Sequence, residues 1–247
     1  MDKKTKKASS RGSRFVSVAA KDTPFAYSEA FKSLRTNLGF LTNTAGVRSI
    51  LLTSAVPEES KSTTAINLAI TLAAEGRSVV LVECDLRKPV LRKYLKRELG
   101  QAGLAAYLAG GIGLEDCIAV LPDLGISVIG AGVVPANPSE LLNSVRMQEL
   151  IGLLKQNYDY VLLDAPPVTV VTDAAVVGRM ADGAVLVVRS RFAAARTIRA
   201  AKNRLQSVGV RLLGGVLTRF DMKKSGWRGG YDYKHYEYGY GQSRGKR

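Results

Sequence analysis

The chain has 247 residues, of which 46% are hydrophobic and 23% are charged, as in an ordinary globular protein that buries its core without disulfides or metals. A single histidine and two cysteines argue against a zinc site, a histidine-based catalytic triad and a disulfide framework. No apolar run reaches the roughly 18 residues of a membrane span, and no apolar stretch follows the basic first residues as it would in a secretory signal. A reduced, cytoplasmic protein is predicted.

The formal net charge of +15 is concentrated at the two ends. Residues 1–14 carry six basic side chains and one acidic one, and residues 223–247 carry seven and two, so each end contributes +5. Residues 15–222 add only another +5. Such ends suit an anionic lipid surface, an acidic partner or a nucleic acid, or they are simply solvated and disordered. Because the middle lacks a basic stripe or a recognition motif, no specific nucleic-acid binding is expected.

Helix and strand patterns alternate along the middle of the chain. The predicted elements, in chain order, are a helix over 25–43, a strand over 49–53, a helix over 63–76, a strand over 79–83, helical pieces broken by glycines over 86–123, a strand and turn over 125–132, a helix over 139–157 with its N-cap at Ser139, a strand over 159–164, a helix over 174–181, a strand over 183–190, a helix over 197–209 and a strand over 212–220. The strands are continuous apolar runs, which is typical of a parallel sheet buried on both faces. The alternation predicts an α/β fold with a doubly wound, mostly parallel sheet flanked by helices.

The composition divides the chain into three parts. We predict a disordered basic arm over residues 1–24, one domain over 25–222 and a flexible tail over 223–247. The tail has few aliphatic residues and six glycines, and it holds half of the chain's ten tyrosines within ten residues. These are Tyr231, Tyr233, Tyr236, Tyr238 and Tyr240.

The loop between the strand at 49–53 and the following helix is a candidate phosphate site. A helix N-terminus offers unpaired N–H groups and partial positive charge to phosphate oxygens. In a P-loop, G-x-x-x-x-G-K-[ST], Lys61 would reach the β- and γ-phosphates and the Ser62 hydroxyl would bind Mg²⁺. Ala55 and Ser60 replace the two glycines, and a positive φ at Ser60 would cost about 1 kcal/mol. The residues expected at the nucleotide are Pro57, Glu58, Glu59, Ser60, Lys61, Ser62 and Thr63. A polar loop with a chance Lys-Ser pair is the alternative.

Two other strands end in acidic residues. Glu83 and Asp85, with Arg87 close behind, stand at the end of the strand over 79–83, and Asp164 ends the strand over 159–164. Ligands of open α/β sheets bind at the carboxyl ends of the strands, and a magnesium–nucleotide site requires acidic residues beside the phosphate loop. A lone aspartate at a strand end can instead cap a helix.

The combination of SAVPEESKSTTAINLA, VVLVECDLRKP, NPSELLNS, YDYVLLDAPPV and a terminal tyrosine cluster resembles the bacterial tyrosine kinases (BY-kinases) of capsule and exopolysaccharide synthesis. These belong to the MinD/ParA-like, deviant-Walker branch of the P-loop ATPases, and the resemblance covers residues 25–247. It implies a P-loop NTPase fold, Mg²⁺ and ATP as cofactors, and autophosphorylation in trans of the tail tyrosines. Polysaccharide polymerisation and export would be the process under control.

The resemblance also implies roles for individual residues. Lys61 and Mg²⁺ would neutralise charge on the transferring group. Asp85, or as second choice Glu83, would orient or deprotonate the phenol, and Arg87 would position phosphates or substrate. Thr218 stands near the place where many relatives carry an asparagine close to adenine. The metal ligands implied are Ser62, Asp85 and Asp164.

Partners are implied by the resemblance as well. Glu29, Lys32 and Arg35 occupy the positions of the E-x-x-R-x-x-R motif on the oligomer-contact helix, which implies a ring-like homo-oligomer. Lysine lacks the bidentate fork of arginine, so contacts through Lys32 would be weaker. A membrane-embedded activator of the polysaccharide co-polymerase type would hold the chain at the inner face of the cell membrane. Its substrate would be its own tail, with other proteins as further candidates.

Two alternatives remain at the level of sequence. One is a positioning or partition ATPase of the same fold, a switch without phosphotransfer to protein. The other is a degraded kinase that acts as a scaffold, because Ala55, Ser60, Glu83 and Thr218 all depart from the common pattern. A Rossmann dehydrogenase fits poorly because no G-x-G-x-x-G follows a strand.

Overall fold

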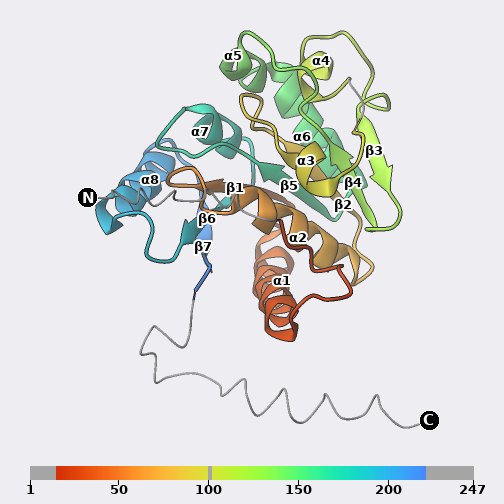
Figure 1. Cartoon of the computed structure of the whole chain (residues 1–247). Coiled ribbons are helices and arrows are strands. Elements are labelled where there is room, and N and C mark those ends of the chain that lie inside the picture. The colour runs from red at the N-terminus through yellow and green to blue at the C-terminus, as the bar shows by residue number, and fades with distance from the viewer. Residues whose placement is uncertain (1–14, 100–101, 221–247) are drawn as a thin grey trace, which may run out of the picture.

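The described part of the chain, residues 15–99 and 102–220 of a computed structural model, is built on one seven-stranded sheet (Figure 1). The strands are β1 (Ser49–Ser54), β2 (Val79–Glu83), β3 (Ile118–Leu121), β4 (Ile126–Ile129), β5 (Tyr160–Asp164), β6 (Gly183–Arg189) and β7 (Leu212–Thr218). Their order is β3-β4-β2-β5-β1-β6-β7, and only β3 runs antiparallel to its neighbour. The predicted doubly wound, mostly parallel sheet is confirmed.

The described residues form eight helices. They are α1 (Phe25–Ala45), α2 (Lys61–Ala73), α3 (Leu91–Leu95), α4 (Leu104–Leu108), α5 (Pro138–Leu142), α6 (Val145–Asn157), α7 (Asp173–Gly178) and α8 (Ala195–Ser207). Side chains alternate along the strands, so Ile50 and Leu52 pack beneath α1, α2 and α3, whereas Leu51 packs beneath α6, α7 and α8. None of these helices combines the length and the apolarity needed to cross a bilayer.

Two local predictions were wrong. The region 86–123 contains β3 as well as helical pieces, and the helix over 139–157 is divided into α5 and α6. Ser144 caps α6, since its hydroxyl accepts a 3.2 Å hydrogen bond from the Met147 amide. Ser139, the predicted N-cap, lies inside α5 after Asn137 and Pro138. Its hydroxyl donates instead to Asp173, in α7.

Residues 15–24, which the composition assigns to the arm, lie against the domain. The buried Asn67 of α2 holds them: its side-chain oxygen accepts from the Val18 amide, and its side-chain nitrogen donates to the Val16 carbonyl, both at 2.8 Å. The Phe15 ring stacks on Tyr94 of α3, with ring centroids 5.5 Å apart. Residues 15–24 therefore pack on the domain, although the composition assigns them to the arm. Residues 1–14 and the predicted tail lie outside the described residues.

Candidate active site

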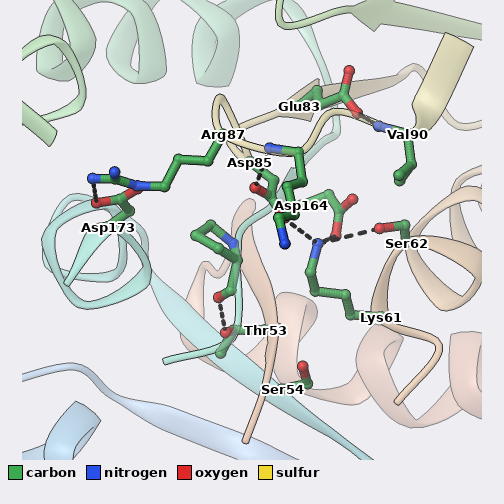
Figure 2. A network of polar contacts seen from close by, with 12 residues as sticks. Thr53, Ser54, Lys61, Ser62, Glu83, Asp85, Arg87, Val90, Asp164 and Asp173 are labelled. Carbon is green, nitrogen blue, oxygen red and sulfur yellow. Dashed lines mark hydrogen bonds and ion pairs between the residues drawn. The ribbon is translucent and has the colours of Figure 1, made fainter. Parts of the chain in front are cut away.

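The carboxyl ends of three neighbouring strands bring the candidate residues together (Figure 2). Lys61 begins α2 after β1, Asp85 follows β2, and Asp164 ends β5. The Lys61 ammonium lies 3.2 Å from Asp85 Oδ2 and 3.3 Å from Asp164 Oδ1, and it donates to the Ser62 hydroxyl at 3.2 Å. All three partners of Lys61 are buried. The expectation that these strand ends converge is met by this geometry.

The loop before α2 has the backbone shape of a phosphate-binding loop. Glu58 and Ser60 have φ values of 66° and 70°, so the left-handed conformation expected at Ser60 is present. A left-handed residue directly before a helical one forms a concave nest of N–H groups that attracts anions. The Ser60 side chain forms no capping hydrogen bond to α2. The Ser60 side chain therefore leaves the first N–H groups of this 13-residue helix available to a phosphate.

Two side chains expected near the nucleotide support the loop from within. Glu59 is buried, and its carboxylate accepts from the amides of Val56 at 2.9 Å and Arg189 at 3.2 Å. The Thr218 hydroxyl, at the end of β7, donates to the Glu59 carbonyl at 3.0 Å. These contacts join the loop to β6 and β7. Both side chains face protein backbone here, which suits them to fix the shape of the loop.

The electrostatics of the site centre on Asp164. Burial raises the pKa of this carboxyl although Lys61 and Ser62 oppose the rise, and its Oδ2 atom has no hydrogen-bond partner among the described residues. Burial would lower the pKa of Lys61, but the charges of Asp164 and Asp85 outweigh it and raise that pKa above its usual value. Lys61 is therefore an ammonium at neutral pH, held between two carboxylates.

These groups fit a magnesium–nucleotide. An ammonium paired with two carboxylates can exchange one of them for a phosphate, and the unpartnered Asp164 oxygen can accept from a metal-bound water or bind the metal. Within the described residues, no group of three or more histidine, cysteine or acidic side chains is placed to hold a metal unaided. That suits Mg²⁺, which takes one or two protein ligands and completes its shell with water and phosphate oxygens.

Glu83 faces away from Lys61 (Figure 2). Its buried carboxylate accepts from the amides of Val90 and Leu91, at the start of α3, and from the Ala131 amide after β4. Burial raises its pKa, while these amides oppose the rise. The structure therefore brings Asp85 to the site and leaves Glu83 outside it. Glu83 joins α3 to the end of β4.

Arg87 also lies apart from Lys61. Its guanidinium donates to Asp173 at 2.8 Å and to the Ser139 hydroxyl at 2.7 Å, which ties the segment after β2 to α5 and α7. Sequence reasoning missed Asp173, which is fully buried, and no motif around it marks it out. Arg87 is two-fifths exposed, and Asp173 and Ser139 hold its guanidinium in place.

A phosphate loop after β1, acidic residues after β2 and β5, and a parallel sheet with β1 between β5 and β6 define a P-loop nucleotide-binding domain. A family model described as an AAA domain matches residues 59–212. The tyrosine-protein kinase YwqD of Bacillus subtilis is 34% identical over 232 residues, which cover 93% of each chain. This chain belongs to the bacterial tyrosine-protein kinases, which are P-loop phosphotransferases.

Solved structures agree with this assignment. The kinase domain of the Escherichia coli tyrosine kinase ETK is similar with a TM-score of 0.78 and 32% identity, over 88% of this chain and 86% of that one. MinD of Pyrococcus horikoshii, solved with Mg-ADP, is similar with a TM-score of 0.60 and 26% identity, over 69% of each chain. The tyrosine-protein kinase wzc of Salmonella typhimurium is 34% identical over 86% of this chain but only 29% of its own length. This chain thus corresponds to one part of that longer relative.

Proposed function

We propose that this chain transfers the γ-phosphoryl group of ATP to tyrosines in the tail of a second copy of the chain. The observation that carries the proposal is the Lys61 ammonium held between Asp85 and Asp164 at the start of α2. The acceptors are the clustered tyrosines near the C-terminus, Tyr231, Tyr233, Tyr236, Tyr238 and Tyr240. Kinship with YwqD and the ETK kinase domain supports the same reaction.

Each residue of the site takes a defined part in this reaction. The phenol oxygen bonds to the γ-phosphorus while the bond from that phosphorus to the β–γ bridging oxygen breaks, so the products are phosphotyrosine and ADP. Asp85 accepts the phenol proton. Lys61 turns from its carboxylates to the phosphates and stabilises charge on the transferring group, and the N–H groups of residues 58–63, beside Pro57, hold the phosphates in line.

The metal ion of this proposal is Mg²⁺, held by Ser62, Asp85 and Asp164. When bound, it neutralises phosphate charge and polarises the transferring group. The unpartnered Asp164 oxygen and the MinD structure with Mg-ADP support this choice. Glu83 is assigned to position the segment that carries Asp85. Arg87 is assigned to position the segment after β2, and Thr218 to position the phosphate loop.

Trans phosphorylation requires copies of the chain to meet, and we propose that α1 provides the contact. Glu29 and Lys32 form a 2.6 Å ion pair on this helix, with the Lys32 side chain half exposed. Arg35 instead donates to the Thr71 carbonyl, near the end of α2, and pairs at 2.9 Å with Glu75, just after that helix. A ring-like homo-oligomer would use Glu29 and Lys32 directly and Arg35 through its hold on α2.

The family resemblance extends the proposal to the cell. A membrane-embedded activator of the polysaccharide co-polymerase type would hold the chain at the inner face of the cell membrane. The kinase would there regulate the polymerisation and export of capsular or exopolysaccharide.

Intact-mass spectrometry before and after incubation with Mg²⁺ and ATP tests the reaction. We expect stepwise gains of one phosphate each, confined by digestion to the peptide that holds Tyr231–Tyr240. Lys61→Met should show no gain, whereas Lys202→Met, a matched change at an exposed position of α8, should behave as wild type. No gain in the wild type, even with the cytoplasmic part of a candidate membrane partner added, would favour an ATPase switch or a scaffold. An ATP titration separates these two, since only the switch binds nucleotide.

A further inference from the structure

A cavity lies beside the active site, and the reaction proposed above does not use it. It has a volume of about 770 Å³, within the range of ligand sites, and it opens between α3 and the loop after β4. Glu83, at the end of β2, forms part of its floor. Four basic side chains from α3 and the residues after it stand on its wall, namely Arg92, Lys93, Lys96 and Arg97.

Two of these four cations have no counter-charge. Arg92 pairs with Glu98 at 2.5 Å, and Arg97 pairs with Asp123 at 2.6 Å. Lys93 and Lys96 form no ion pair with any described residue. The Glu83 carboxylate in the floor is already bonded to three backbone amides. The lining of the cavity therefore includes two lysines that have no ion pair among the described residues, and their charge favours a ligand that carries about two negative charges.

The rest of the wall is partly apolar and also includes Glu98, the partner of Arg92. Pro89, Leu99 and Val133 line the same cavity, and Val133 is three-quarters exposed. An apolar surface beside two ammonium groups is complementary to an aromatic ring that carries a phosphate. Inorganic phosphate would use the ammonium groups alone. The mixed wall thus favours a phosphotyrosine side chain.

The cavity is close to the catalytic aspartate along the chain. Glu83 lines the cavity and Asp85 lies in the active site, and two residues of extended chain span at most about 7 Å. Successive tyrosines of the tail are two or three residues apart, as Tyr236 and Tyr238 are. A tail laid across both positions can place one tyrosine near the cavity while the next reaches Asp85.

We propose that the cavity binds a phosphotyrosine of the substrate tail and thereby presents the neighbouring tyrosine to Asp85. This rests on the proposed kinase reaction. Residues 231–240 carry two acidic side chains and one lysine, a net charge of −1, and each phosphate adds roughly −1.5 to −2. Attraction to Lys93 and Lys96 therefore grows after the first phosphate. Phosphorylation of the tail becomes sequential, with the first transfer slow and the later ones faster.

Peptide binding tests the cavity without any catalysis. Fluorescence anisotropy of the dephosphorylated full chain, without ATP, would compare a labelled peptide of residues 229–242 carrying phosphate on Tyr236 with the unmodified peptide. We expect the phosphopeptide to bind at least about tenfold more tightly. Lys93→Gln/Lys96→Gln should abolish the difference and Lys93→Arg/Lys96→Arg should keep it. Arg199→Gln/Lys202→Gln, at exposed positions of α8, should also keep it.

Competitors identify the ligand. Free phosphotyrosine should displace the phosphopeptide at concentrations where inorganic phosphate does not. Equal affinity of the two peptides, an equal loss in the α8 variant, or equal displacement by inorganic phosphate would each overturn the proposal.

A time course with Mg²⁺ and ATP separates this proposal from the kinase reaction itself. In Lys93→Gln/Lys96→Gln, the first phosphate should arrive at the wild-type rate and singly phosphorylated chain should accumulate. If the wild type gains no phosphate, the kinase proposal fails. If it gains several, and the variant passes through the same intermediates at the same rates, the cavity proposal fails alone.

Discussion

At the scale of single residues, the phosphate loop carries conformational strain. Ser60 has a φ of 70° and forms no capping bond, so its side chain contributes nothing that offsets the left-handed backbone. Such a conformation costs an L-residue about 1–2 kcal/mol, and glycine is free of that cost. The strain lies in the loop that is proposed to bind phosphate, and such strain is common at functional sites.

Replacing Ser60 by glycine should relieve this strain. We expect the free energy of unfolding of Ser60→Gly to be about 1 kcal/mol higher than that of Ser60→Ala. Alanine keeps the strained backbone, and the change to alanine removes no capping hydrogen bond. Urea denaturation of both variants, without nucleotide, gives the comparison. Equal stabilities would mean that the loop relaxes to another conformation when Ser60 is changed.

The two acidic residues after β2 should respond differently to substitution. Asp85→Asn removes the proposed proton acceptor beside Lys61, so phosphate gain should slow by about 100-fold or more. Glu83→Gln removes a buried carboxylate that three amides hold, so it should destabilise the fold by about 1–3 kcal/mol. Its rate per folded molecule should stay within about tenfold of wild type.

Intact-mass time courses and urea denaturation of both variants make this measurement. A Glu83→Gln variant that folds as wild type and transfers no phosphate would reverse the two assignments.

At the scale of elements, Asp182 joins the start of β6 to β1 and α6. It lies at the amino ends of the strands, whereas the active site lies at their carboxyl ends. Its carboxylate accepts from the amides of Arg48 and Ser49, at the start of β1, and from Lys155 of α6. Burial would raise the pKa of Asp182, but these hydrogen bonds outweigh it and lower the pKa below the usual 3.8. The charged carboxylate therefore stabilises the fold at neutral pH.

Asp182→Asn should destabilise the protein by about 1–3 kcal/mol at pH 7. Because the folded pKa is lowered, the contribution is present above pH 3.8 and is lost as the pH falls through the folded value. The difference from wild type should therefore shrink between pH 5 and about pH 3. Asp22→Asn, at an exposed position, is the control and should show no such difference. Denaturation curves across this pH range decide, and a difference independent of pH would contradict the assignment.

The elements also differ in how well their sequence patterns predict them. β1, β2 and β5 are buried along their whole length, and their continuous apolar runs predicted them. β3 is an edge strand of four residues that is only partly buried, so its pattern is weak. The break between α5 and α6 was not predicted because Ser139 and Ser144 are both suitable N-cap residues. In the structure Ser144 caps α6, whereas the Ser139 hydroxyl donates to Asp173.

At the scale of the whole molecule, assembly through α1 should be separable from folding. Glu29→Ala/Lys32→Ala removes an exposed ion pair, so the monomer should keep its stability while the oligomer dissociates and trans phosphorylation slows. Arg35→Ala removes contacts from α1 to α2 within the chain, so it should lower stability first. Light scattering after size-exclusion chromatography and thermal unfolding measure the two effects. Assembly unchanged in Glu29→Ala/Lys32→Ala would exclude this face as the contact.

The sequence by itself determined the sheet, the phosphate loop and the meeting of Lys61, Asp85 and Asp164. The reason is local: apolar runs specify parallel strands, and parallel strands deliver whatever follows them to one edge of the sheet. The positive φ of Ser60 followed in the same way from the place of that residue before the lysine.

Only the tertiary structure decided which of the neighbouring polar side chains reach Lys61. Glu83 and Asp85 are two residues apart and chemically alike, yet amides of α3 and of Ala131 engage the first and leave the second to the site. Asp173 and Ser139 hold Arg87 away in the same manner. The partners in these contacts come from distant segments of the chain. Their effect depends on hydrogen bonds made after folding, which no pattern within one segment encodes.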